Sequence, residues 1–474
     1  MVDRDKHRQL HIYMDERKLS VVVHSLFSAW MLAFLYEGQI FYALAGRFSI
    51  SPYEMLFGGM ASLLVGAFFC GFIIKTMKNA KKLFLFSYIV FILTSAAFFF
   101  TPSLLWNIGI IVSSFLAGGC VAAWGFFLKS YTPKNERFKT IADMLILSNV
   151  LMVALNMAAI HISPYLGLLL AVLMLIAAFV LALRLPVNNC STQPDSSQRE
   201  ASSISIAGSL AFLCLFVTII TIDSGLMYQV INPAFAHLEW LTSWYWALPY
   251  IAALFIMKNL PRRINMTYIL YISIAMIGLS FIFFMGLKHT VINYLMVNTL
   301  MLGAFGVYDL FWWSILGEML EFHNNPAKIL GIGLSANLLG VLLGGIIGRV
   351  VTSVDINNQN PLLLALIVVC VTLALLPPLH KHLSCLLKNH SFLTVFSEMP
   401  EQEKTIQINQ AKNFGKLTER ESQVTSLLLQ GKTYKKIAAE LYISDNTVKY
   451  YVKNIYSKFN VKSRSELIDI MMKD

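Results

Sequence analysis

The chain has 474 residues, of which 57% are hydrophobic and 13% are charged, and its mean hydropathy is +0.64. One soluble core cannot take up so large an apolar share, so the composition excludes an ordinary soluble globular protein and indicates a membrane protein. The formal net charge of +11 lies largely between apolar runs, where it reports on membrane topology.

Apolar runs of about 20 residues, the length that crosses a bilayer as a helix, recur along most of the chain. The first run is too long for the ~7–15-residue core of a signal peptide, and we interpret it as a retained helix that follows an N-terminal segment, 1–19. The sequence predicts twelve spans, at residues 20–44, 53–74, 83–101, 104–128, 140–161, 163–184, 205–229, 240–257, 265–287, 291–317, 327–350 and 361–380.

Lys and Arg are distributed unequally on the two sides of these spans. They crowd the N-terminal segment and the connections that follow every even-numbered span, whereas the other side carries Arg47, Lys288 and Arg349. The positive-inside rule then predicts a cytoplasmic N-terminus. An even number of spans returns the C-terminus to the same side, and we expect the protein in the bacterial cytoplasmic (inner) membrane.

A polar, Ser-rich segment at 185–204 divides the spans into two six-helix halves, 20–184 and 205–383. The halves have related sequences. Glu37 in the first span and Asp223 in the seventh hold matching positions, and each is followed at the same spacing by a tyrosine. A near-constant offset between such matches predicts a duplication of six helices.

Two six-helix halves joined by a cytoplasmic loop resemble the major facilitator superfamily, over about residues 20–380. That family carries a signature G-x-x-x-D-R-x-G-R-[RK] between its second and third spans, where this chain has GFIIKTMKNAKK. Gly71 is kept, but Lys75 stands at the acidic position and Lys78 at the second glycine. The acid takes part in the family's alternating-access gating, so its loss argues against active transport.

Polar residues within the spans are candidates for binding a small ligand. In the resembled fold, spans one, four, seven and ten line a central cavity, and an ionised carboxylate that faces lipid is costly. We expect such acids to face the cavity or to be neutral, with aromatic neighbours that offer stacking or cation–π surface. The alternative is that the aromatic residues form interfacial belts and the acids pair with polar partners. The candidates are Glu37, Tyr42, Trp124, Asp223, Tyr228, Asp309 and Trp312, and they would suit a cationic or hydroxyl-bearing ligand, or protons.

After a linker at 384–415, the pattern becomes that of a small soluble helical domain, 416–474. Thr418 and Glu421 form a capping box, and the helix that they open turns an apolar face inward. A second helix follows from Tyr434 to Leu441. The expected inward residues of these two helices are Val424, Leu427, Leu428, Ile437, Ala438 and Leu441.

Ser444 caps a third helix, after a short turn, in which the apolar residues Val448, Val452, Ile455 and Phe459 form one stripe. The opposite face is polar. A helix, a short turn and a helix with such a face is the geometry that places the second helix in the major groove of DNA. The residues of that face are Asn446, Tyr450, Lys453 and Ser457, flanked by Lys449 and Asn454.

The segments LTERESQV, GKTYKKIAAELYIS, NTVKYYVKNIYSKF and VKSRSELI together resemble the DNA-binding domain of the LuxR family over 416–474. The resemblance implies base contacts from Lys449, Tyr450 and Lys453, and an asparagine such as Asn446 can pair with adenine. It also implies backbone contacts from Thr447, Asn454 and Lys458, helix-holding roles for Glu421 and Gly431, and a last helix that dimerises. The implied partner is double-stranded promoter DNA, bound by a homodimer.

The sequence contains no Walker lysine loop, HExxH or GxSxG motif, and no residue set that suggests catalysis, a cofactor or a metal site. We therefore expect an all-α membrane protein that is not an enzyme. One hypothesis is a one-component regulator, in which the spans sense a small ligand, shift the cytoplasmic linker and control the DNA-binding domain. The alternative is a secondary transporter of the major facilitator type with an attached regulatory domain.

Overall fold

The computed structural model describes residues 2–36, 39–187, 199–260, 266–354, 363, 365–379, 416–429, 432, 434–461, 466–467 and 470. All regular secondary structure in these residues is helical, which confirms the all-α class. The chain divides into two compact units, Met1–Asn189 with Leu213–Leu376, and Cys190–Phe212 with Pro377–Asp474. The first is called the membrane unit below.

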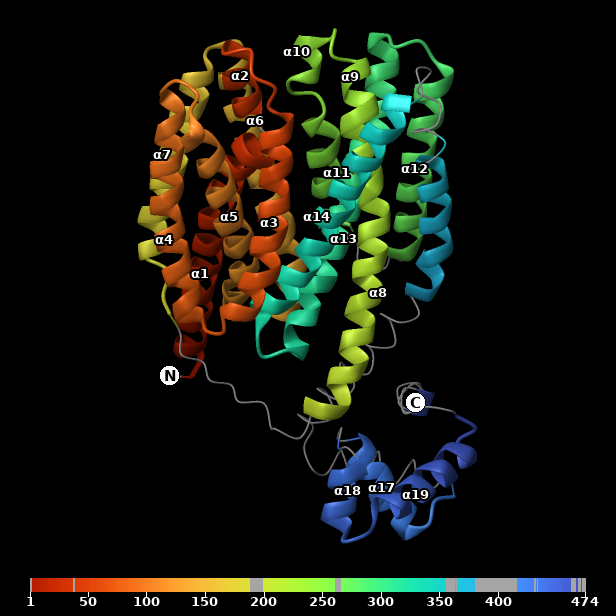
Figure 1. Cartoon of the computed structure of the whole chain (residues 1–474). Coiled ribbons are helices and arrows are strands. Elements are labelled where there is room, and N and C mark those ends of the chain that lie inside the picture. Colours follow the sequence, from red (N-terminus) through yellow and green to blue (C-terminus); the bar gives the residue numbers. More distant parts are fainter. Residues whose placement is uncertain are drawn as a thin grey trace. The chain divides into compact units, whose positions relative to one another are not determined.

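The first half of the membrane unit occupies the red to yellow part of Figure 1. Its helices are α1 (Val2–Trp30), the π-helical η1 (Met31–Tyr36), α2 (Gln39–Arg47), α3 (Tyr53–Ile73), α4 (Met77–Ala96), η2 (Ala97–Phe99), α5 (Leu104–Tyr131), η3 (Lys134–Glu136), α6 (Arg137–His161) and α7 (Pro164–Leu183).

The second half lies beside the first in Figure 1. It contains α8 (Arg199–Leu226), which belongs to this unit from Leu213 on, the π-helical η4 (Met227–Ile231), α9 (Asn232–Ala234), α10 (Glu239–Thr242), α11 (Ala247–Asn259), α12 (Met266–Gly286), α13 (Val291–Met319), η5 (Leu320–Phe322) and α14 (Pro326–Val354).

Local sequence signals set several of these boundaries. Thr76 caps α4 by accepting a hydrogen bond from the Asn79 backbone N–H at 3.2 Å, and Thr290 caps α13 in the same way. The α7 helix begins at Pro164, where a missing N–H has no helical partner to lose. Caps at the membrane surface satisfy backbone groups that the bilayer could not.

The described residues contain eleven helical segments that are long and apolar enough to cross a membrane, from Glu16–Tyr36 to Pro326–Val350. A shorter apolar helix, Ala365–Leu379, falls within the predicted twelfth span, 361–380. Residues 361, 362, 364 and 380 of that span lie outside the described residues. The membrane character is confirmed, and the number twelve stays a prediction.

Two predicted spans contain irregular helical geometry. The first, 20–44, passes from α1 directly into the π-helical η1, and α2 begins at Gln39, after residues 37 and 38, which lie outside the described residues. The eighth, 240–257, contains α10 and α11 with turn residues 243–246 between them, within one segment, Glu239–Asn259, that is long and apolar enough to cross a membrane. Hydropathy records how apolar a segment is and not how its backbone is hydrogen-bonded, so it does not report such irregularities. π-helical turns occur frequently at functional sites.

The two halves meet closely where α14 lies against α3. The Asn325 side-chain amide donates to the Gly71 carbonyl oxygen at 2.9 Å, and the Ser335 hydroxyl donates to the Leu64 carbonyl oxygen at 3.3 Å. A Cβ added to Gly331 would lie 2.4 Å from the Ala67 carbonyl oxygen. Small residues thus let the two backbones approach, as is usual in membrane helix pairs.

The C-terminal unit contains α17 (Glu419–Leu429), α18 (Tyr434–Leu441) and α19 (Asp445–Lys458). The predicted inward faces are confirmed: Val424, Ile437, Val448 and Ile455 are fully buried, and Leu441 is partly buried against the same core. This core draws only on residues between Leu417 and Leu467 among those described. Gly431 lies outside the described residues, and so do residues 463–465 of the VKSRSELI segment, where the last helix is predicted to begin.

Candidate functional site

A cavity of about 170 Å³ lies within the membrane unit and is lined by both halves. From the first half, α1 and α6 contribute His24, Ser28 and Asn149, among others; the second half contributes residues of α8, η4, α11, α13 and α14. Three of the predicted ligand-binding residues line it, namely Tyr228, Asp309 and Trp312.

Asp309 is the carboxylate of this cavity, and two neighbours hold it in place. The Tyr250 hydroxyl donates to Oδ2 at 2.8 Å, and the Trp312 indole N–H donates to Oδ1 at 3.0 Å. Both donors also line the cavity. A carboxylate has about four acceptor positions, so Asp309, which is half-buried, keeps capacity for a further donor.

Asp223 has a different environment from Asp309. It is fully buried, and neither carboxylate oxygen has a hydrogen-bond partner within the described part of the chain. Its neighbours Thr221 and Ser224 line the cavity, whereas Asp223 is not among the described lining residues. An ionised carboxylate without partners is costly in an apolar environment, which distinguishes the surroundings of Asp223 from those of the hydrogen-bonded Asp309.

The remaining predicted ligand residues are spread out. Trp124 is buried and donates its indole N–H to the Ser20 hydroxyl at 3.1 Å, and it is not among the described lining residues of the cavity. Tyr42 is 45% exposed and does not line the cavity as described. Glu37 lies outside the described residues, so its predicted pairing with Asp223 stays a prediction.

An aromatic chain connects the two halves beside the cavity. The His24 ring stacks on Trp124 with centroids 4.4 Å apart, and Trp124 meets Trp313 edge to face at 6.2 Å. Trp313 stacks on Trp312 at 5.0 Å, and Trp312 bonds Asp309. Sequence reasoning missed His24 and Tyr250, because a single polar residue in an apolar run carries no signal of which face it occupies.

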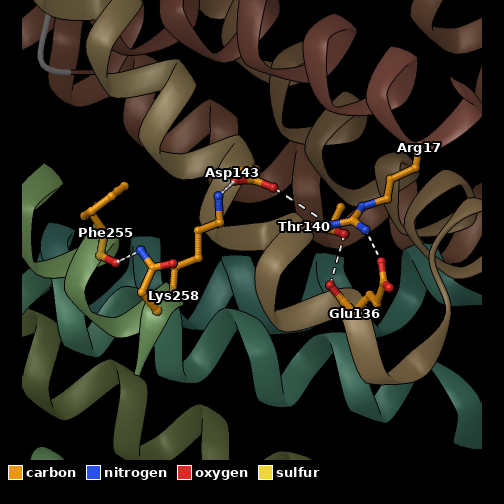
Figure 2. A network of polar contacts seen from close by, with 7 residues as sticks. Arg17, Glu136, Thr140, Asp143, Phe255 and Lys258 are labelled. Atoms are coloured by element: carbon orange, nitrogen blue, oxygen red, sulfur yellow. Dashed lines mark hydrogen bonds and ion pairs between the residues drawn. The ribbon is translucent and has the colours of Figure 1, made fainter. Parts of the chain in front are cut away.

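A network of charged residues joins the halves at one end of the helices (Figure 2). Arg17 of α1 forms an ion pair with Glu136 and lies 3.8 Å from Asp143 of α6. Lys258 of α11 forms an ion pair with the same Asp143. Because α6 belongs to the first half and α11 to the second, the Lys258–Asp143 pair connects them.

A second connection of this kind centres on Arg137, which is 3% exposed. Its guanidinium forms an ion pair with Glu321 of η5 and donates to the Gly317 carbonyl oxygen at 3.0 Å. Lys129 of α5 donates to the Leu320 carbonyl oxygen at 2.8 Å. Removing one partner of a buried ion pair leaves an uncompensated charge, so these contacts resist separation of the halves.

The second candidate site is the exposed face of α19. Asn446, Lys449, Tyr450 and Lys453 are exposed, and Tyr450 reaches 63%. Ser444 caps the helix by accepting from the Thr447 backbone N–H at 3.1 Å. The apolar stripe of α19 faces the core, so the predicted groove face points outward. Asn454 is half-buried.

Lys458, a predicted contact to the DNA backbone, also has partners within the domain. Its ammonium lies 2.5 Å from Glu421 Oε2 and 3.1 Å from the Lys416 carbonyl oxygen. Glu421 is 4% exposed, and its carboxylate accepts from the Thr418 backbone N–H at 2.7 Å while its own N–H donates to the Thr418 hydroxyl, which confirms the capping box. Glu421 thereby links the start of α17 to the end of α19.

These contacts also set the pKa of Glu421. Burial alone would raise it, but the hydrogen bonds from Lys458 and Thr418 together outweigh burial and hold the pKa below its usual value.

Comparison with known proteins agrees with both resemblances. Residues 415–471 match the family described as bacterial regulatory proteins, luxR family. The chain is 48% identical over 52 residues to the spore germination protein GerE of Bacillus subtilis (strain 168), which is 11% of this chain and 70% of GerE. It is 49% identical over 51 residues to the nitrate/nitrite response regulator protein NarP of Escherichia coli (strain K12), 11% of this chain and 24% of NarP.

The membrane unit is similar to a solved major facilitator superfamily transporter, FucP, in the outward conformation. The TM-score is 0.54 with 14% sequence identity, covering 77% of this chain and 98% of that chain. The likeness confirms the predicted major facilitator fold. The molecule therefore combines a transcription-regulator DNA-binding domain with a multi-pass membrane region of that fold.

We predict that Glu421→Gln destabilises the isolated segment 416–474 by about 1–3 kcal/mol at pH 7, because the buried side chain at position 421 loses its charge-assisted bond with Lys458. The pKa of Glu421 is lowered in the folded state, so its stabilisation is present above the unfolded pKa of ~4.3 and is lost as pH falls through the folded value. Urea unfolding from pH 7 to pH 3 measures this.

Glu440→Gln is the matched control, since Glu440 is 46% exposed in its ion pair with Lys432 and such a pair contributes less than about 1 kcal/mol. Equal losses in the two variants would contradict the role given to Glu421.

Proposed function

Because the chain belongs to the luxR family of bacterial regulatory proteins through residues 415–471, we propose that it is a membrane-embedded one-component transcriptional regulator. Its membrane unit senses a small ligand, and residues 416–474 bind promoter DNA. The observation that carries this proposal is one chain that holds both a luxR-type domain and a cavity, with a carboxylate in its lining, that is shared by two membrane halves.

The sensor role is favoured over transport by the connection between α3 and α4. Lys75 and Lys78, which replace the acid and the glycine of the gating signature, are both exposed. Neither has an ion pair within the described residues. The fold itself favours the alternative, since a transporter shares it. Uptake by proteoliposomes of a compound that changes promoter output would support transport.

The contacts supply a route from ligand to output. The α13 helix carries Asp309 in the cavity and leads into η5, where Glu321 pairs with Arg137. The α1 helix carries His24, which belongs to the aromatic chain, and also Arg17, which belongs to the charged network. A ligand that prefers one arrangement of the halves shifts the balance between arrangements, and the linker at 384–415 passes this shift to the DNA-binding domain.

For the DNA site, we propose that Lys449, Tyr450 and Lys453 contact bases, helped by Asn446, while Thr447 and Asn454 contact the backbone. Their positions along one exposed helix support this. Lys458 is proposed to have two roles, since it also holds Glu421. We further propose that the last helix, mostly outside the described residues, forms a homodimer on DNA.

The topology follows from the same proposal, because the domain must reach DNA. We propose that both termini are cytoplasmic and that the protein lies in the bacterial inner membrane, as the Lys and Arg distribution predicts. A reporter enzyme that works only in the cytoplasm should be active when fused after Asp474, and one that works only in the periplasm should be inactive there. A periplasmic readout would contradict both topology and function.

We predict that Lys449→Ala with Lys453→Ala weakens binding of the isolated domain to its promoter duplex. The slope of affinity against salt should fall by up to about one unit for each lost phosphate contact. Fluorescence anisotropy at several salt concentrations measures both quantities. The control is Lys432→Ala, which removes a lysine that forms an ion pair with Glu440. Unchanged DNA binding in the double variant would contradict the proposal that the exposed face of α19 contacts DNA.

Lys258→Met tests the control step, because it removes the inter-half pair with Asp143 and leaves the Arg17 contacts of the first half in place. We expect promoter output from the full-length chain to change at least twofold, since loss of a partly buried pair of about 1 kcal/mol shifts the balance of arrangements. The exposed Lys288→Met should behave as wild type. Unchanged output in Lys258→Met at equal protein level counts against control by the halves.

A further inference from the structure

The described lining of the cavity carries an acidic residue and no lysine or arginine. Among the described lining residues, Asp309 is the carboxylate and none is Lys or Arg. His24 also lines it, but its ring is 1% exposed and stacked on Trp124. Resting on the proposed sensor function, we propose that the cavity binds a small organic cation, with Asp309 as its counter-ion.

The setting of Asp309 suits an ammonium group. Tyr250 and Trp312, which belong to the cavity wall, each donate a hydrogen bond to one carboxylate oxygen. The carboxylate is therefore pre-positioned, and its remaining acceptor positions can face the cavity. Hydrogen bonds between an ionised donor and a carboxylate are about twice as strong as neutral ones. A site away from bulk water screens that attraction less than the surface does.

Aromatic rings provide the second half of a cation site. Besides Tyr250 and Trp312, the cavity is lined by Trp246, Tyr308 and Trp313 from the same half. The faces of such rings attract alkylammonium groups, most strongly where the cation is desolvated. A carboxylate within an aromatic wall is therefore matched to the charge and to the apolar body of an organic amine.

Other ligand classes fit the lining less well. A polyol needs many free hydroxyl and amide partners, but the side chains of Ser148, Asn149 and Thr221 donate to carbonyl oxygens of their own helices. An anion would meet the carboxylate with no lysine or arginine in the described lining. A bound metal ion needs several oxygen or nitrogen ligands, and the described residues contain no group of three or more candidate metal ligands.

The test compares cations with neutral molecules of the same shape. Full-length protein in detergent is heated with choline or its neutral counterpart 3,3-dimethylbutan-1-ol, and with tyramine or its neutral counterpart 4-propylphenol. We expect at least one cation to raise the unfolding midpoint in a concentration-dependent way that its neutral counterpart does not reproduce. Asp309→Asn should weaken this apparent affinity by about tenfold or more. Glu239→Gln, the same charge change at an exposed residue of α10, should not.

Stabilisation by neutral counterparts as strong as by cations, stabilisation that survives Asp309→Asn, or no stabilisation by either cation would overturn the cation assignment. The proposed sensor function fails separately. A cation that binds the cavity but leaves promoter output of the full-length chain unchanged would contradict the sensor function and support the organic-cation site. A promoter response to a neutral compound that is unaffected by Asp309→Asn would support the sensor function and contradict the organic-cation site.

Discussion

An ion pair between helices is hard to separate where a partner is buried, because removing the other partner leaves a charge without compensation. In this protein the buried Arg137 pairs with Glu321 and the more exposed Lys258 pairs with Asp143, and both pairs join the two halves of the membrane unit at one end. The cavity and its aromatic chain depend on how the halves meet there, since both halves supply its walls. An interface of discrete charged contacts has distinct arrangements, and a ligand bound between the halves can favour one of them.

The DNA-binding domain presents the same kind of constraint on a smaller scale. Glu421 is buried at the junction of α17 and α19 and is satisfied by Thr418 and Lys458. This fixes the recognition helix against its neighbours, so that the apolar stripe of α19 faces the core and its lysine face is left outward. Under the proposed function, control would act on the position or pairing of this domain and not on its fold.

Much of this architecture could be predicted from the sequence. Hydropathy predicts spans because a bilayer imposes length and apolar content, and heptad-like spacing predicts which side of α19 is buried. The π-helical geometry of η1 and the turn between α10 and α11 could not be predicted this way, since they depend on backbone hydrogen bonding. Nor could the different surroundings of Asp223 and Asp309, because whether an intramembrane acid meets Tyr250 or no partner is decided by helix rotation and by residues far apart in the chain. The ion pairs between the halves could not be predicted either, because their partners are also far apart in the chain.

The most direct measurement is the affinity of the full-length chain in lipid nanodiscs for its promoter duplex, with and without a compound that changes promoter output in cells. Binding at two sites of one molecule is reciprocal, so the compound should alter DNA affinity of the full-length chain and leave that of segment 416–474 unchanged. Equal DNA affinity of the full-length chain in both conditions would contradict control of the domain by the membrane unit.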